Sequence, residues 1–139
     1  MGANSAARRL AKKILYPLAN ETSYAYFQAV SKAWDIRNGT WTEPEIELLP
    51  MGLKPGETAI DLGANFGIYS YFMGKAVGPN GRVFAFEPIP FTFRSLKIVS
   101  RLLRFENSVQ LFEKGCGNEH TTIEFSVPVQ GSGALAAGQ

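Results

Sequence analysis

The chain has 139 residues, 45% of them hydrophobic and 19% charged, which is typical of one ordinary globular domain. The net charge is only +2, and no basic stripe with interleaved aromatic residues occurs, so nucleic acid is not an expected partner. One cysteine excludes an internal disulfide, and no continuous apolar segment of membrane-spanning length exists, so a cytoplasmic protein is expected.

The N-terminal part of the sequence has the pattern of helices. Apolar residues recur at helical spacing from Ser5 to about Val30, with one break, which predicts two helices. An Asn-Gly pair at 38–39 predicts a turn after them. We therefore predict a helical lead-in over residues 1–42 and a second domain over residues 43–139.

A short helix is predicted after this turn. The segment Thr42-Glu43-Pro44-Glu45 has the form of a capping box, in which the Thr42 hydroxyl accepts from an amide three residues on and Glu45 reaches back. Pro50 and Gly52 should end this helix.

Strand and helix patterns then alternate. Strands are predicted at Thr58–Leu62, Arg82–Phe86 and Val109–Phe112, with a helix from Ile68 to Val77 and another through Phe93 and Leu103. Two strand–helix–strand crossovers imply a parallel sheet with right-handed connections and helices covering its faces. A further strand is predicted at Thr121–Val127. The last ten residues are mostly small, as in flexible segments, and they lack the apolar pattern of an element that packs in a core.

The turn between the first strand and its helix is the most informative segment. It reads Asp61-Leu62-Gly63-Ala64-Asn65-Phe66-Gly67, and Glu87 ends the next strand. Ligands of open parallel sheets bind at the carboxyl ends of the strands, so Asp61, Gly63 and Glu87 should converge on one crevice. Glycine permits close approach of a ligand, and a carboxylate can accept two hydrogen bonds from a ribose diol. These features predict a ligand that contains a ribose.

The details of the turn indicate which ribose ligand is bound. Asn65 stands where the dinucleotide fingerprint has its second glycine. Asp61 would repel a pyrophosphate but attract the ammonium of a methionine group, which favours S-adenosylmethionine. Three alternatives remain: a fragment of an NAD-type Rossmann oxidoreductase, a non-catalytic nucleotide-binding module, and a purely structural turn in which the glycines permit packing and Asp61 caps the helix.

The sequence blocks resemble those of the FkbM-type methyltransferases. The similarity covers Trp41 to about Val127 and includes Trp41-Thr42-Glu43-Pro44-Glu45, Leu53-Lys54-Pro55-Gly56-Glu57, Asp61 to Ser70, Ala85 to Pro90, and Gly117-Asn118. It implies an α/β Rossmann-like methyltransferase sheet, S-adenosylmethionine as the cofactor, and usually O-methylation of a hydroxyl on a sugar or small metabolite. No metal site is expected. The residues expected to bind the cofactor are Asp61, Gly63, Ala64, Asn65, Phe66, Gly67, Glu87 and Pro88.

The sequence departs from that family after the predicted hairpin. The family continues into a strand with an Asp-x-Glu-Gly block and into further strands that shape the acceptor pocket. We therefore expect only the N-terminal, cofactor-binding half here, with no assignable catalytic residue and no activity by this chain alone. Apolar side chains that later strands would cover should then be exposed, namely Val109, Leu111, Ile123 and Phe125.

Several other residues have a structural interpretation that is favoured over a functional one. Cys116 is expected to be a small buried residue rather than a contact to adenine. His120 is expected in a surface turn rather than as a general base. An aromatic group is expected to form a packing surface rather than an acceptor site, and it comprises Tyr24, Phe27, Trp34 and Trp41.

Overall fold

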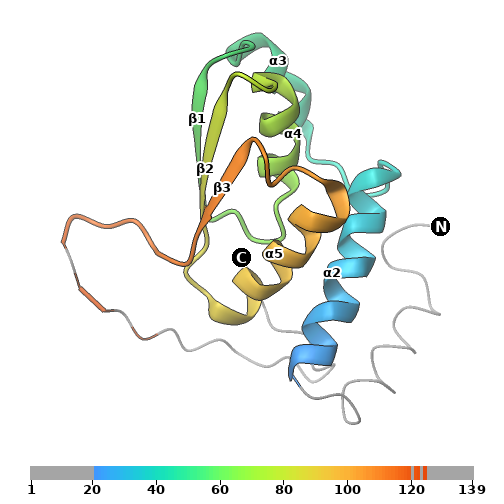
Figure 1. The fold of residues 1–139 in the computed structure, drawn as a ribbon, viewed down its shortest axis with the longest axis vertical. Helices are drawn as coiled ribbons and strands as arrows, with labels where there is room; N and C mark the ends of the chain where they lie inside the picture. Colours follow the sequence, from blue (N-terminus) through green and yellow to red (C-terminus); the bar gives the residue numbers. More distant parts are fainter. Residues whose placement is uncertain (1–20, 120, 123, 125–139) are drawn as a thin grey trace.

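Three parallel strands and the helices beside them form the fold (Figure 1). The computed structural model describes residues 21–119 together with 121, 122 and 124. The elements in chain order are α2 (Glu21–Arg37), the 3₁₀ helix η1 (Pro44–Leu48), α3 (Leu49–Gly52), β1 (Thr58–Leu62), α4 (Ile68–Val77), β2 (Arg82–Phe86), α5 (Pro90–Leu103) and β3 (Val109–Phe112).

The sheet has the strand order β1-β2-β3, and both neighbouring pairs are parallel. Asp61 is in register with Ala85, which is in register with Leu111. All three predicted strands are confirmed with the expected bounds, and so is the α/β class. The parallel arrangement brings the carboxyl ends of the strands to one edge of the sheet.

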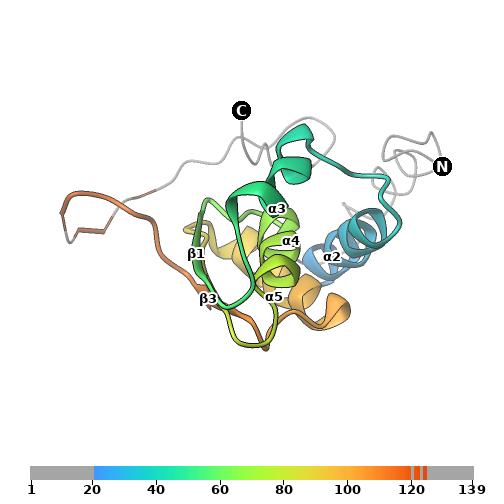
Figure 2. The same cartoon turned by 90° about the horizontal axis from the view of Figure 1, so that it is seen from above.

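The described helices α2, α4 and α5 lie on one side of the sheet (Figure 2). The prediction that helices cover both faces is therefore wrong for the described part of the chain. The strand order explains the difference. Successive right-handed crossovers that advance across a sheet in one direction place their helices on the same face.

The other face of the sheet carries an apolar patch that the described residues leave uncovered. We call it the open face, and it consists of Ile60, Leu62, Phe84, Phe86 and Phe112. Ile60 is 60% exposed and Leu62 is 61% exposed. The rings of Phe86 and Phe112 stack on each other with their centroids 4.8 Å apart.

The apolar exposure expected on β3 is only partly found. Val109 is 3% exposed, so its predicted exposure is wrong, while Leu111 is half-buried against the core. The physical reason is alternation along the strand, which turns Val109 toward the helices and Phe112 toward the open face. Ile123 and Phe125 lie outside the described residues.

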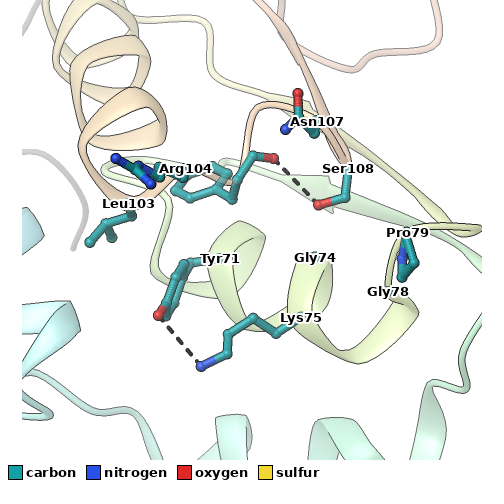
Figure 3. A pocket seen from close by; sticks show the side chains of 10 residues that line it. Tyr71, Gly74, Lys75, Gly78, Pro79, Leu103, Arg104, Asn107 and Ser108 are labelled. Carbon is teal, nitrogen blue, oxygen red and sulfur yellow. Dashed lines mark hydrogen bonds between the residues drawn. The ribbon is translucent and has the colours of Figure 1, made fainter.

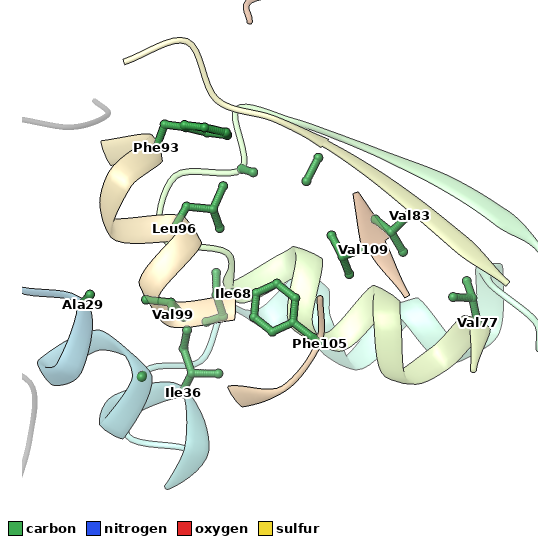
Figure 4. Close-up of a cluster of buried hydrophobic side chains, with 13 residues drawn as sticks. Ala29, Ile36, Ile68, Val77, Val83, Phe93, Leu96, Val99, Phe105 and Val109 are labelled. Carbon is green, nitrogen blue, oxygen red and sulfur yellow. The ribbon is translucent and has the colours of Figure 1, made fainter. Parts of the chain in front are cut away.

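The core lies between the sheet and the helices, as Figure 4 shows. Helix α2 packs mainly against α5 and contributes the small side chains of Ala29 and Ala33, which allow close approach of the two helices. Other members of this core are Ile36, Ile68, Val77, Val83, Phe93, Leu96, Val99, Phe105 and Val109. Residues of the predicted lead-in and of the predicted second domain therefore share one hydrophobic core.

Helix α2 continues to Arg37, beyond the predicted end near Val30. The segment 31–37 contains no glycine or proline, so nothing local stops the helix. It ends at the predicted Asn-Gly turn, where Gly39 has φ of 65°. The first predicted helix lies outside the described residues. None of the helices in the described ranges has the length and apolar character that a membrane crossing requires.

The predicted capping box is wrong. Glu43 is the N-cap of η1, and no side chain caps it. Its carboxylate Oε1 instead accepts from Trp41 Nε1 at 2.9 Å, and Oε2 of Glu45 accepts from the Tyr69 hydroxyl at 3.3 Å. Pro50 does not end a helix but lies in the first turn of α3, a position where a missing N–H costs nothing.

The expected strand at Thr121–Val127 lies largely outside the described residues. Residues 121, 122 and 124 are described and are not in a strand. His120 also lies outside the described residues.

Candidate cofactor site at the carboxyl ends of the strands

The glycine loop, defined here as residues 63–67, connects β1 to α4 through three left-handed residues. Gly63, Asn65 and Gly67 have φ of 79°, 51° and 86°. The N–H groups of Gly63 and Ala64 both donate to the Phe86 carbonyl at 2.9 Å, and the Gly67 N–H donates to the Ala64 carbonyl at 2.7 Å. The loop is therefore fastened to the end of β2, one residue before Glu87.

The Glu87 carboxylate joins the two loops at this edge. Its Oε2 accepts from the Asn65 N–H at 2.9 Å, and its Oε1 accepts from the Ile89 N–H at 2.9 Å. The side chain is only 4% exposed. An ionised carboxylate has about four acceptor positions, so the two backbone bonds orient Glu87 and leave about two positions for a ligand.

Asn65 carries two unfavourable features at the same point. Its left-handed backbone is uncommon for a residue with a side chain. Its Oδ1 is buried and has no hydrogen-bond partner among the described residues. An unsatisfied buried acceptor costs about 1–3 kcal/mol, and such costs concentrate at functional sites. A ligand donor at this position would relieve the second cost.

The two glycines that flank the loop have different surroundings. A Cβ at Gly63 would meet nothing within 4 Å. A Cβ at Gly67 would lie 2.6 Å from Leu96 Cδ1 and 3.1 Å from Phe105 Cζ. Gly63 therefore leaves space that a ligand can enter, whereas Gly67 lets the start of α4 pack against α5 and the residues after it.

Asp61 lies on the helix-covered side of β1 and is 6% exposed. The Ser70 hydroxyl donates to its Oδ2 at 2.5 Å, which ties the strand to the first turn of α4. Burial raises the pKa of Asp61 above its ordinary value of 3.8, while the hydrogen bonds from Ser70 oppose that rise. The contact with Ser70 agrees with the structural alternative for Asp61, in which its carboxylate holds the start of the helix.

A hollow of about 1150 Å³ opens beside this edge of the sheet. We call it the strand-end hollow, and it is lined by Leu62, Gly63, Phe86, Pro88, residues 113–119, Thr121 and Thr122. Cys116 lines it and is exposed, so the prediction of a buried cysteine is wrong. The segment that carries Cys116 contains no helix or strand to cover it.

The eight residues predicted to bind the cofactor fall into three groups. Gly63 and Pro88 line the strand-end hollow. Asn65 and Glu87 are joined by a hydrogen bond and do not line the hollow themselves. The others are buried, namely Asp61 in β1 and the loop residues Ala64, Phe66 and Gly67.

Sequence reasoning missed part of the lining of this hollow. Glu113 and Lys114 directly follow β3, and both line the strand-end hollow. Their position was the available signal, since residues that follow parallel strands meet at the same sheet edge. No group of three or more possible metal ligands lies together in the described part of the chain.

A second hollow of about 390 Å³ lies at the other end of α4 (Figure 3). Lys75 in the last turn of α4 and Arg104 at the C-cap of α5 line it. Cations are favoured at the C-terminal ends of helices, where the helix dipole is negative. The fold accounts for these charges, and we assign this second hollow no ligand.

The predicted packing role of the aromatic group is found for two of its members. Tyr24 is 3% exposed and its ring stacks on Phe91 at 6.0 Å, and the Trp41 ring contacts Phe66 edge-on. Trp34 is 63% exposed.

Comparisons with known proteins give similarity only to solved structures. No protein-family model and no curated protein matches the chain. The chain is similar to a putative rRNA-methylase from Clostridium thermocellum, with 27% identity over 51% of this chain and 38% of that chain, at a TM-score of 0.49. It is also similar to a SAM dependent methyltransferase from Aquifex aeolicus, with 21% identity over 70% of this chain and 52% of that chain, at a TM-score of 0.45. The chain thus spans about 38% and 52% of the lengths of these two structures.

Proposed function

We propose that the chain binds S-adenosylmethionine at the carboxyl ends of β1 and β2 and serves as the cofactor-binding part of a methyltransferase. The observation that carries this proposal is the Glu87 carboxylate, held by Asn65 and Ile89 and placed in the chain between Phe86 and Pro88, which both line the strand-end hollow. The sequence blocks further favour the FkbM type, whose acceptor would be a hydroxyl of a sugar or small metabolite.

The chemistry of this edge fits the cofactor. The free acceptor positions of Glu87 suit the two hydroxyls of a ribose, and their geometry is set in advance by the backbone N–H donors. Gly63 presents no Cβ to the hollow and so permits close approach of the cofactor. Asn65 Oδ1 is an acceptor that lacks a donor, which a polar hydrogen of the ligand would supply.

The same loop is poorly suited to NAD. Dinucleotide sites hold the pyrophosphate over a glycine-rich turn at a helix N-terminus, with glycine two residues after the first. Here that position is Asn65, and the buried Asp61 carboxylate lies close in sequence to the turn. Both features disfavour a bound pyrophosphate.

Bound S-adenosylmethionine would supply a methyl group activated by the positive sulfur, because a neutral thioether is a good leaving group. The residues of this chain would bind and orient the cofactor. Glu87 would hold the ribose, and the glycine loop would set how closely the cofactor approaches the backbone. Alignment of the reacting atoms is the main protein contribution to such a transfer. We assign no general base to the described residues.

Calorimetric titration with S-adenosylmethionine, S-adenosylhomocysteine and NAD tests this proposal. The first two should bind and NAD should not. Glu87→Gln should weaken binding by about tenfold or more, because a charge-assisted hydrogen bond is lost and the amide cannot accept at both of its ends. Glu57→Gln is the matched control, since Oε2 of Glu57 also accepts a backbone N–H, from Lys54 at 2.8 Å, at the opposite end of β1 from the proposed site.

Urea unfolding of the same variants separates lost binding from lost folding. Binding of NAD without binding of S-adenosylmethionine would overturn the proposal in favour of an oxidoreductase fragment. Equal affinity in Glu87→Gln and Glu57→Gln would show that Glu87 does not contact the cofactor.

A further inference from the structure

We propose that Lys32 and Trp41 are positioning residues that hold the glycine loop ready for its ligand, an inference that rests on the proposed function. Lys32 Nζ lies 3.9 Å from the centroid of the Trp41 ring and 5.4 Å from that of Phe66. The two rings meet edge-on with centroids 6.5 Å apart and an interplanar angle of 71°. We call Lys32, Trp41 and Phe66 the aromatic clamp.

The aromatic clamp acts on the part of the loop that matters for binding. Phe66 directly follows Asn65, whose N–H is held by Glu87, and directly precedes Gly67. Its side chain is 8% exposed, so its ring is enclosed rather than free to reorient in solvent. Asn65 is therefore held from one side by Glu87 and from the other through the clamped Phe66.

The partner residues of Phe66 are themselves fixed to the fold. Trp41 Nε1 donates to Glu43 Oε1 at 2.9 Å, and the Trp41 N–H donates to the Asp35 carbonyl at 3.3 Å. Lys32 lies on α2, whose inner side packs in the main core. The helix before the sheet thus helps to set the position of the glycine loop, through the contacts of Lys32 and Trp41 with Phe66.

Cation–π contacts stabilise by roughly 0.5–2 kcal/mol depending on exposure, which corresponds to about two- to thirtyfold in an equilibrium constant. A contact of this size on a left-handed loop shifts the fraction of molecules in the binding-competent arrangement. A second cation–π contact in the chain serves for comparison. Lys75 Nζ lies 5.0 Å from the Tyr71 ring centroid at the second hollow, whose lining includes no residue of the glycine loop (Figure 3).

The test compares Lys32→Met with Lys75→Met by titration of S-adenosylmethionine. Methionine keeps an apolar stem over the rings while it removes the charge. Lys32→Met should weaken binding by about three- to tenfold, and Lys75→Met should leave it unchanged. Lys32→Arg should restore the affinity, because a guanidinium also stacks on tryptophan.

Amide hydrogen exchange gives a second readout that needs no cofactor. Exchange at Asn65 and Gly67, whose N–H groups are hydrogen-bonded, should be faster in Lys32→Met and unchanged in Lys75→Met. If the unsubstituted chain does not bind S-adenosylmethionine, the proposed function fails, while faster exchange still supports the clamp. If exchange at both amides is the same in Lys32→Met as in the unsubstituted chain, the clamp is refuted.

Discussion

Gly67→Ala should destabilise the chain far more than Gly63→Ala, although both residues are glycines of one loop with nearly equal φ. A left-handed backbone costs an L-residue about 1–2 kcal/mol, and both substitutions incur this cost. The Cβ at position 67 would also lie 2.6 Å from Leu96 Cδ1, inside a core where overpacking typically costs about 1–3 kcal/mol. The expected losses are therefore about 2–5 kcal/mol for Gly67→Ala and about 1–2 kcal/mol for Gly63→Ala.

Urea unfolding monitored by circular dichroism measures both losses, with the slope m compared to exclude a change in the denatured state. Cofactor affinity should show the opposite order. Gly63→Ala should bind the cofactor more weakly than Gly67→Ala, provided that both variants are folded. The methyl group of Gly63→Ala points into free space that the ligand would occupy. Equal losses of stability in the two variants would refute the assignment of Gly67 to packing and Gly63 to the ligand.

Three further predictions concern other parts of the molecule. Burial raises the pKa of Asp61 above 3.8, so folding takes up a proton and this carboxyl lowers stability as the pH rises from 3.8 through the raised pKa. The urea midpoint of Asp61→Asn relative to that of the unsubstituted chain should therefore increase as the pH rises from about 4 through the raised pKa; a constant difference would contradict this. Asn65→Gly should stabilise the chain by about 1 kcal/mol, because glycine tolerates φ of 51°, and should weaken cofactor binding; unchanged affinity would show that the strain has no role in binding. The exposed open face should make the chain self-associate with rising concentration in sedimentation; Leu62→Glu should reduce this association and Glu47→Gln, outside that face, should not.

The sheet was predictable from the sequence because each strand is a short apolar segment bounded by turn residues. Thr58–Leu62 comes after a Pro-Gly turn and meets Gly63 directly, so its bounds are fixed on both sides. Arg82–Phe86 lies between the glycine turn at 78–81 and Pro88. The end of helix α2 was predicted too early, near Val30. The helix continues to Arg37 because no residue between Val30 and Asn38 interrupts it.

The details of the site depend on contacts that local patterns do not contain. Thr42 and Glu45 have the form of a capping box, but Glu45 accepts from Tyr69, a partner 24 residues away. Glu87 was predicted to bind the ligand. Its hydrogen bonds to Asn65 and Ile89 could not be predicted, because they depend on how two loops lie relative to each other. Gly63 and Gly67 look alike in the sequence, and only the packing of Leu96 separates their roles.

The most direct test of the central claim is the change in amide NMR shifts when S-adenosylmethionine is added to the chain. The largest changes should occur at Asn65 and Ile89, whose N–H groups hold Glu87, and at Gly63 and Cys116 beside the strand-end hollow. Amides at the second hollow, such as that of Ser108, should not change. Saturable changes at Ser108 with none at Asn65 and Ile89 would contradict the account.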